Sequence, residues 1–366
     1  MFCREPLVAR NLKSPRISGR VISALTLLAV LALNRTGFVD RLNASQATSG
    51  APSGRDDSAR MAKFERMARD GSEAALESRL QAYVRQHPSS ARAHYLLGYV
   101  YFQQKRNEEA VRELLRSVEL DGNDAHARAL LSWVHMTENR CDLAQNELER
   151  AVELRPGWDE AHYRLGRVYL IEEDFMRAKS EFERAIKLSP DYREAWNALG
   201  VAMEALNDGP GARASFEKAN AVGRAAGKPL AAPYINISGY YNRRGEPARA
   251  IEFAKKALAI NPKADLACFE LGRAYRIQEK WSEAQGALER AIALKSDTAQ
   301  YHYVLSIVYR KLGKQAESRR SLETFRDLDR KYAEIETQRR RGRTMSSHRD
   351  EAAFEPLTEG FWREIR

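Results

Sequence analysis

The sequence predicts an all-α fold, a solenoid of about seven copies of one helix-turn-helix unit, from two regular series of small residues. An aliphatic residue followed by Gly or Ser recurs at intervals of 34, 34, 34, 38, 34 and 34 residues; the small residues are Gly98, Ser132, Gly166, Gly200, Ser238, Gly272 and Ser306. Twelve residues after each comes a second one: Ala110, Ala144, Ala178, Ala212, Ala250, Ala284 and Ser318. Small residues at fixed spacing let two helices pack closely. One such pair cannot bury its own apolar face, so the units must stack.

The series continues with an aromatic or aliphatic residue four positions further on and a proline near the end of several units, at Pro156, Pro190 and Pro262. The whole pattern, W-x2-L-G-x2-Y…A-x3-F…P, resembles the tetratricopeptide repeat family. The resemblance covers residues 91–332 and implies a right-handed solenoid whose first helices line a concave groove. The units are 91–124, 125–158, 159–192, 193–230, 231–264, 265–298 and 299–332.

The family's Trp position varies in this chain. It holds His94, Arg128, His162, Trp196, Tyr234, Cys268 and His302. Because the three histidines recur where an aromatic core residue is expected, we interpret them as core residues, and no metal site is predicted.

Both ends of the predicted solenoid, residues 61–340, are irregular. Residues 57–90 form a degenerate first unit with Leu80, Tyr83 and Pro88 in register, and residues 316–340 are expected to form a capping helix. The interval of 38 residues places four extra residues around Gly223–Pro229. We interpret them as a lengthened connection that bends the solenoid; a contact loop is the alternative.

The first 60 residues predict export. Residues 1–20 are basic, residues 21–33 are an uncharged apolar run, and residues 34–60 are expected to be a flexible linker. Thirteen helical residues span about 20 Å, less than a bilayer core. A cleaved signal and an uncleaved membrane anchor therefore both remain open. Both place the solenoid outside the cytoplasm, on the periplasmic side in a bacterium.

The charge does not predict a nucleic-acid binder. The net charge is +10 over 366 residues, but residues 1–60 alone hold nine Lys and Arg against four Asp and Glu. The remainder is thinly spread, without a concentrated basic face. No catalytic motif, metal-ligand spacing or cofactor motif occurs, and we expect no enzyme activity and no cofactor. Cys141 and Cys268 lie four units apart, too far for a disulfide, and are expected to be buried free thiols.

The resemblance places a ligand groove on one face of the first helices, at offsets −3, +1 and +4 from each small residue. Aromatic and Arg side chains there are typical anchors for a partner protein. The candidates are Tyr95, Tyr99, Phe102, Trp133, Met136, Tyr163, Arg167, Arg273, Arg276 and Arg310. Residues at −3 could instead pack between adjacent first helices. We expect an extended or helical peptide, acidic towards one end, as the ligand.

The tail, residues 341–366, carries an apolar set in a polar context: Phe354, Leu357, Phe361, Trp362 and Ile365. It either folds back over the last helices or is a docking peptide for another protein. The sequence thus favours a non-enzymatic scaffold that binds a protein or peptide and assembles a complex at the cell envelope. Two alternatives are an accessory of polysaccharide export or modification and a non-catalytic subunit of an enzyme complex.

Overall fold

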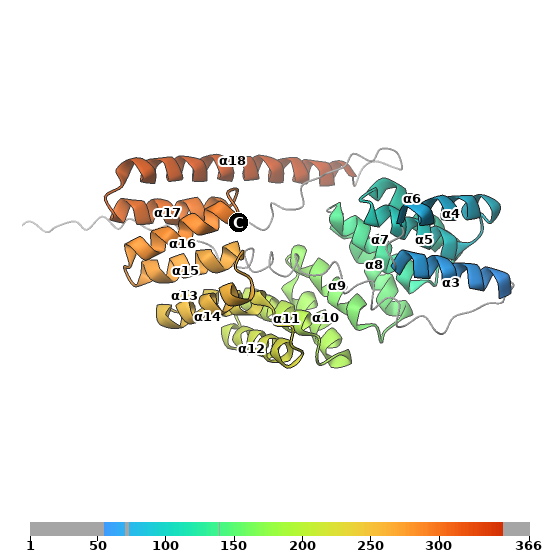
Figure 1. Ribbon diagram of the computed structural model, residues 1–366, viewed down its shortest axis with the longest axis horizontal. Helices are drawn as coiled ribbons and strands as arrows, with labels where there is room; N and C mark the ends of the chain where they lie inside the picture. The colour runs from blue at the N-terminus through green and yellow to red at the C-terminus, as the bar shows by residue number, and fades with distance from the viewer. Residues whose placement is uncertain (1–54, 70–72, 139, 347–366) are drawn as a thin grey trace, which may run out of the picture.

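The computed structural model describes residues 55–69, 73–138 and 140–346, and within them the chain forms helices and no strands, which confirms the all-α repeat fold. The helices follow a curved path from α3–α8 at one end, through α9–α12, to α15–α18 at the other (Figure 1). Their bounds are α3 Arg55–Arg69, α4 Glu73–Gln86, α5 Ala91–Gln103, α6 Asn107–Leu120, α7 Ala125–Thr137, α8 Cys141–Leu154, α9 Asp159–Ile171, α10 Phe175–Leu188, α11 Arg193–Ala205, α12 Gly209–Ala225, α13 Ala231–Arg243, α14 Pro247–Ile260, α15 Asp265–Ile277, α16 Trp281–Leu294, α17 Ala299–Lys311 and α18 Gln315–Ser346.

The small residues set how closely the two helices of a unit approach. A Cβ added at Gly200 would lie 2.4 Å from Cε1 of Phe216, and one at Gly166 would lie 2.7 Å from Cε1 of Phe182. Ser238 fits because its Oγ donates a hydrogen bond of 2.8 Å to the Ala250 carbonyl on the facing helix. The recurrent Gly or Ser is therefore a steric requirement of the helix pair.

The turn between the two helices of a unit requires one left-handed residue. It lies seven positions after the small residue, and glycine occupies it at Gly245 and Gly313. Elsewhere an ordinary residue adopts the same positive φ: Lys105, Glu173, Asn207 and Glu279. A side chain in this conformation costs about 1–2 kcal/mol, so the described turns hold mild strain at these four residues.

In five of the seven units, the residue at the variable Trp position anchors the unit to the connection before it. A ring nitrogen of His162 hydrogen-bonds the Pro156 carbonyl at 3.0 Å, and Trp196 Nε1 donates to the Pro190 carbonyl at 2.9 Å. His94, Arg128 and His302 bond the carbonyl six residues back in the same way, to Pro88, Gly122 and Ser296. The three histidines are buried, as the core interpretation predicts.

Most of the extra residues of the long interval do not lengthen the connection, so the prediction was wrong for three of the four. These three extend the second helix, because α12 has 17 residues where α10 and α14 have 14, and the fourth lengthens the connection to α13 by one residue. The segment Ala219–Ala225, in which three of seven residues are alanine, continues the helix. Gly227, with φ +65°, then ends it, and Lys228 N–H bonds the Gly223 carbonyl at 2.9 Å.

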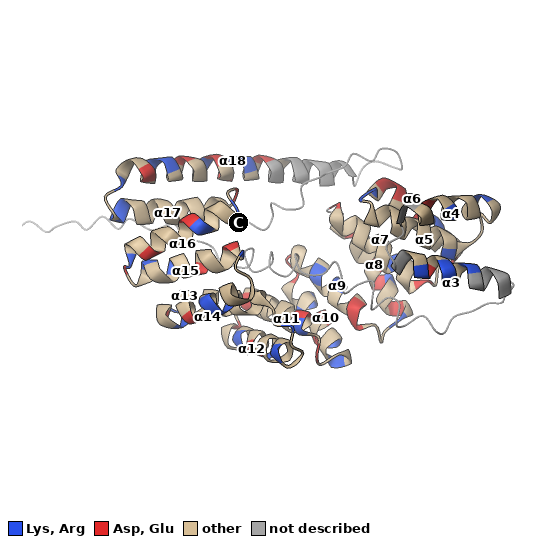
Figure 2. Ribbon diagram, viewed as in Figure 1, with Lys and Arg blue, Asp and Glu red and all other residues tan. Residues whose placement is uncertain are grey.

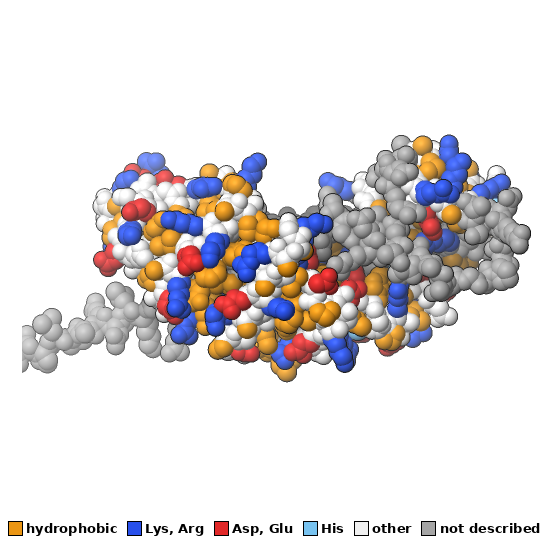
Figure 3. All heavy atoms as spheres, turned by 60° about the horizontal axis from the view of Figure 1, so that its bottom comes forward, with side chains coloured by type: hydrophobic (Ala, Val, Ile, Leu, Met, Phe, Trp, Pro, Cys, Tyr) orange, Lys and Arg blue, Asp and Glu red, His pale blue; other side chains and the backbone are white. Residues whose placement is uncertain are grey.

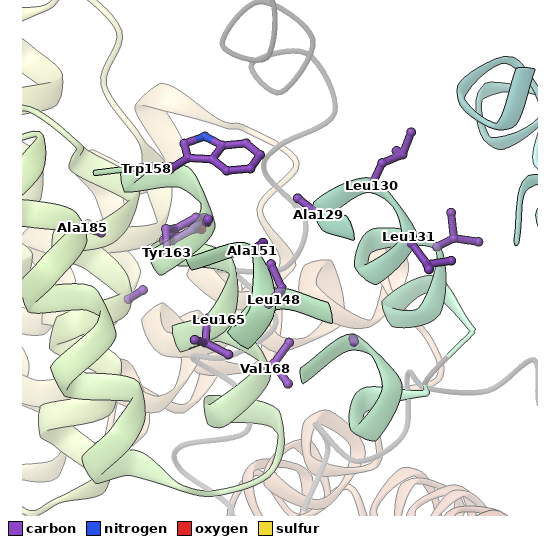
Figure 4. Packing of buried hydrophobic residues seen from close by; sticks show 14 of the residues in the cluster. Ala129, Leu130, Leu131, Leu148, Ala151, Trp158, Tyr163, Leu165, Val168 and Ala185 are labelled. Atoms are coloured by element: carbon purple, nitrogen blue, oxygen red, sulfur yellow. The ribbon is translucent and has the colours of Figure 1, made fainter. Parts of the chain in front are cut away.

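The buried apolar side chains form two main clusters that meet near α13. The larger runs from Phe64 through Phe216 and reaches α13–α15; the smaller gathers side chains of α13–α17. Within the larger cluster, Leu148 and Ala151 of α8 lie beside Leu165 and Val168 of α9 (Figure 4). Cys141 and Cys268 are buried, and neither forms a disulfide with another described residue.

The two ends of the stack are covered by amphipathic helices. At the first end, Phe64 of α3 and Leu80 of α4 are buried. At the last, α18 packs along α17, where Tyr332 is buried against Ala299, and it then runs on past the end of α17 (Figure 1). Lys, Arg, Asp and Glu side chains are interspersed along the first half of α18 (Figure 2). This helix forms the predicted cap.

None of the helices α3–α18 combines the length and hydrophobicity that a membrane span needs. The apolar run at residues 21–33 and the tail side chains Phe354, Leu357, Phe361 and Trp362 lie outside the described residues.

Candidate functional site

The first helices of the units line the inner side of the curve. First helices of successive units contact one another directly, although a second helix separates them in the chain. These contacts join α5 to α7, α9 to α11, α11 to α13, α13 to α15, and α15 to α17. Elements on the inside of a curved stack approach most closely, so the face that these helices share is the concave one. The surface is hollowed between the two ends of the stack (Figure 3).

The early part of this face is aromatic. Tyr95 and Tyr99 are buried, whereas Phe102, Trp133 and Met136 are half-buried. The Tyr99 hydroxyl accepts a hydrogen bond of 2.7 Å from Gln103 Nε2. Phe102, Trp133 and Met136 therefore present more of their surface to a ligand than the two tyrosines do.

The third unit adds two buried arginines beside this aromatic surface. The Arg164 guanidinium lies 3.9 Å from the centre of the Trp133 ring, and its Nη2 is 2.8 Å from Glu160 Oε1. Arg164 is 1% exposed, and burial lowers its pKa despite the opposing charge of Glu160. The Glu160 carboxylate also accepts a hydrogen bond from the Tyr192 hydroxyl. Sequence reasoning missed Arg164 because it lies at offset −2, outside the three offsets used.

Arg167, which the sequence placed in the groove, stacks in the same cluster. Its guanidinium lies 5.5 Å from the Trp133 ring centre and 5.7 Å from that of Tyr163, and the residue is 3% exposed. Tyr163 is buried too. The side chains of Tyr163 and Arg167 thus lie mostly inside the stack, next to the half-buried Trp133.

The late part of the face carries a network of charges on α11, α13 and α15. Arg243 forms an ion pair with Glu204. Arg273 Nη1 donates to Glu270 Oε1 at 2.9 Å, and Asn242 Nδ2 donates to Glu270 Oε2 at 2.6 Å. Burial lowers the pKa of Arg243 to about 10; the charge of Glu270 opposes this shift and that of Arg273 adds to it. The sequence identified Arg273 but not Arg243, Glu204 or Glu270.

Two further arginines lie at offset +4 of the face, one beside this network on α15 and one in the next unit on α17. Arg276, on α15, is half-buried, and its Nε has no hydrogen-bond partner among the described residues. Burial and then the charge of Arg273 lower its pKa. Arg310, on α17, is exposed. Arg273, Arg276 and Arg310 thus give the late face a surplus of positive charge.

Sequence models of the tetratricopeptide repeat match residues 73–125, 172–229 and 242–307. The chain belongs to the tetratricopeptide repeat family. Proteins of this family generally mediate interactions between proteins, and the repeat is typically a non-catalytic scaffold. No curated protein matches the chain.

Solved structures with a similar fold are also repeat proteins. A tetratricopeptide repeat protein from Parabacteroides merdae ATCC 43184 is 15% identical, with a TM-score of 0.55 over 70% of this chain and 99% of that one. PilW, a type IV pilus biogenesis factor, is 20% identical, with a TM-score of 0.49 over 54% of this chain and 90% of that one. YrrB, described as having an unusual peptide-binding site, is 19% identical, with a TM-score of 0.40 over 51% and 95%. At these identities the likeness concerns the fold alone.

Proposed function

We propose that the chain is a non-enzymatic scaffold that holds a partner protein or peptide in its concave groove and assembles a complex at the cell envelope. The composition of the inner face supports this most directly. Its early part carries half-buried aromatic and apolar side chains, and its late part carries basic side chains. Phe102, Trp133 and Met136 lie in the early part, and Arg273, Arg276 and Arg310 in the late part. Such a surface suits a partner segment with an apolar and an acidic portion.

The location at the envelope rests on residues 1–33, a basic segment followed by an apolar run. We expect the repeats to face the periplasm if the source is bacterial. Protease added to intact spheroplasts should then digest the repeats, while a cytoplasmic marker stays protected. Repeats that are digested only after lysis would contradict this location.

The groove is tested by removing apolar surface from half-buried positions. The double variant Phe102→Ser and Met136→Ser should lose the partner that the wild-type chain captures by crosslinking in membranes. The matched control is Leu115→Ser with Met176→Ser, which removes apolar side chains that are 42% and 65% exposed on the second helices. Circular dichroism establishes that both variants fold. Equal loss in both variants, or in neither, would show that the early groove does not bind the partner.

A further inference from the structure

Three arginines meet on the inner face of α13 and α15, and within the described part of the chain two carboxylates pair with them. Arg243 is paired with Glu204, and Arg273 with Glu270. Arg276 is the third arginine. It forms no ion pair or hydrogen bond with a described residue, and its Nε is buried without a partner. Among the neighbouring charges, that of Arg273 has the largest effect on the pKa of Arg276, and it lowers this pKa because the two positive charges repel. The network therefore carries one uncompensated positive charge.

Gly239 leaves this network open to the groove. It lies at offset +1, one of the three groove offsets, and a Cβ built there would be 3.3 Å from Arg243 Nη1 and 3.6 Å from Glu270 Oε1. The guanidinium and the carboxylate thus lie close to a position that has no side chain of its own. The side chains of Arg243 and Arg273 are 21% and 18% exposed, so a ligand can reach both from the groove.

The geometry favours one carboxylate as the missing anion. A guanidinium presents N–H donors in a fork that matches a carboxylate, and partial burial strengthens the attraction. A single negative charge balances the single surplus charge. A phosphate dianion would place a second negative charge beside Glu204 and Glu270, which both remain in the network. Tyr303 and Ile307 of α17 are half-buried, on the groove offsets of the next unit, and offer apolar contact to a neighbouring ligand residue.

We propose that Arg243, Arg273 and Arg276 form a carboxylate subsite that takes an Asp or Glu side chain from an acidic segment of the partner protein. This subsite rests on the proposed function, and it names the chemistry of the partner at the late end of the groove.

The test uses the full chain and a fluorescein-labelled peptide of six glutamates, acetylated and amidated so that only side-chain carboxylates are present. A peptide of six glutamines is the neutral probe. Fluorescence anisotropy at low ionic strength should show binding of the glutamate peptide alone. Arg276→Gln should weaken it about tenfold or more, as expected for a lost charged hydrogen bond. Arg276→Lys, which keeps the charge without the fork, should fall between Gln and wild type.

The matched control is Lys255→Gln, which removes one exposed positive charge from α14, a second helix. It should change the affinity less than about twofold, as expected for screened surface charge. Equal weakening by Arg276→Gln and Lys255→Gln would overturn the subsite, since binding would then follow net charge. Inorganic phosphate should displace the peptide no better than chloride at the same ionic strength. Better displacement by phosphate would overturn the choice of a carboxylate.

Partner capture separates this proposal from the proposed function. If Phe102→Ser with Met136→Ser abolishes capture but the peptide does not distinguish Arg276→Gln from Lys255→Gln, the groove function stands and the carboxylate subsite fails. If those groove variants leave capture unchanged, the proposed function fails, whatever the peptide result.

Discussion

The third and sixth units use the same groove positions in opposite ways. Arg167 and Arg273 occupy the same offset, and the guanidinium of each lies 5.7 Å from the centre of the aromatic ring four residues earlier, Tyr163 or Phe269. At this same offset the preceding unit has Trp133 in one case and Gly239 in the other. The ring of Trp133 lies 5.5 Å from the Arg167 guanidinium and helps to bury it, whereas a Cβ at Gly239 would lie near Arg243 and near Glu270, the partner of Arg273.

The neighbours of these arginines differ in charge as well. At offset −2 the third unit has Arg164, which stacks on Trp133, and the sixth has Glu270, which pairs with Arg273. The third unit therefore uses its cations to cover an aromatic ring. The sixth uses a carboxylate to orient one arginine while Arg276 is left without an anion. Equivalent positions in a repeat array have different roles because the adjacent unit decides what surrounds them.

Removing the ring tests this comparison most strongly. Trp133→Ala removes the surface on which Arg164 and Arg167 stack, so we expect the free energy of unfolding to fall by about 3–4 kcal/mol. Urea titration followed by far-UV circular dichroism measures it. Phe269→Leu in the sixth unit, which keeps most of the buried volume, should cost about 1 kcal/mol. A loss below about 1 kcal/mol for Trp133→Ala would mean that the arginines do not depend on the ring.

Acid should weaken the early half through His135 of α7. Burial first, and the charge of Arg140 second, lower the pKa of this imidazole to about 4. The unfolded chain has a pKa of about 6.5 there, so it binds a proton that the folded state excludes. Above about pH 6.5 the imidazole is neutral in both states and does not affect the free energy of unfolding. As the pH falls from there towards 4, the free energy of unfolding decreases by roughly 2–3 kcal/mol. Urea midpoints at about pH 7.5 and 4.5 measure this loss, and His135→Gln should remove it.

Substitutions at Gly200 and Gly239 test whether each glycine is closely packed or lies at an open site. Gly200→Ala should cost about 2 kcal/mol, because its Cβ would lie 2.4 Å from the buried Phe216 ring. Gly239→Ala should instead stabilise the chain by about 0.5 kcal/mol, since its Cβ would meet the far end of the Arg243 side chain at 3.3 Å and Glu270 at an ordinary contact distance of 3.6 Å, and alanine favours the helix. Thermal unfolding of both variants provides the measurement. Similar losses in the two would show that Gly239 is also closely packed.

The turns should behave alike in both halves. Lys105 in the first unit and Glu279 in the sixth have positive φ at the position that Gly313 occupies in the seventh. Lys105→Gly and Glu279→Gly should each stabilise the chain by about 1 kcal/mol, and Gly313→Ala should destabilise it by a similar amount. Differential scanning calorimetry can resolve these changes. Opposite signs for Lys105→Gly and Glu279→Gly would mean that the two halves also differ outside the inner face.

The sequence predicted the fold well because its signals are local and repeated. The spacing of Gly98, Gly166 and Gly200 reports helix pairs that must touch, and it recurs often enough to average out single departures. The site was predicted only in part. The offsets identified Trp133 and Arg273, but not Arg164 and Arg243, whose importance depends on side chains one unit away. The position of three of the four extra residues was also misjudged, because helix propensity extended α12 through them.

By itself the sequence determined the repeat and its length, since a 34-residue period of small and apolar residues requires paired helices that stack, and the resemblance to the family implied which face of each first helix turns inward. Only the tertiary structure decided which inward residues are covered and which stay accessible. Trp133 and Gly239 are equivalent in the repeat, and so are Arg167 and Arg273, yet one arginine is buried and the other lies within an accessible charged network. The physical reason is that burial and charge compensation depend on the neighbouring unit, which the period of a single unit does not specify.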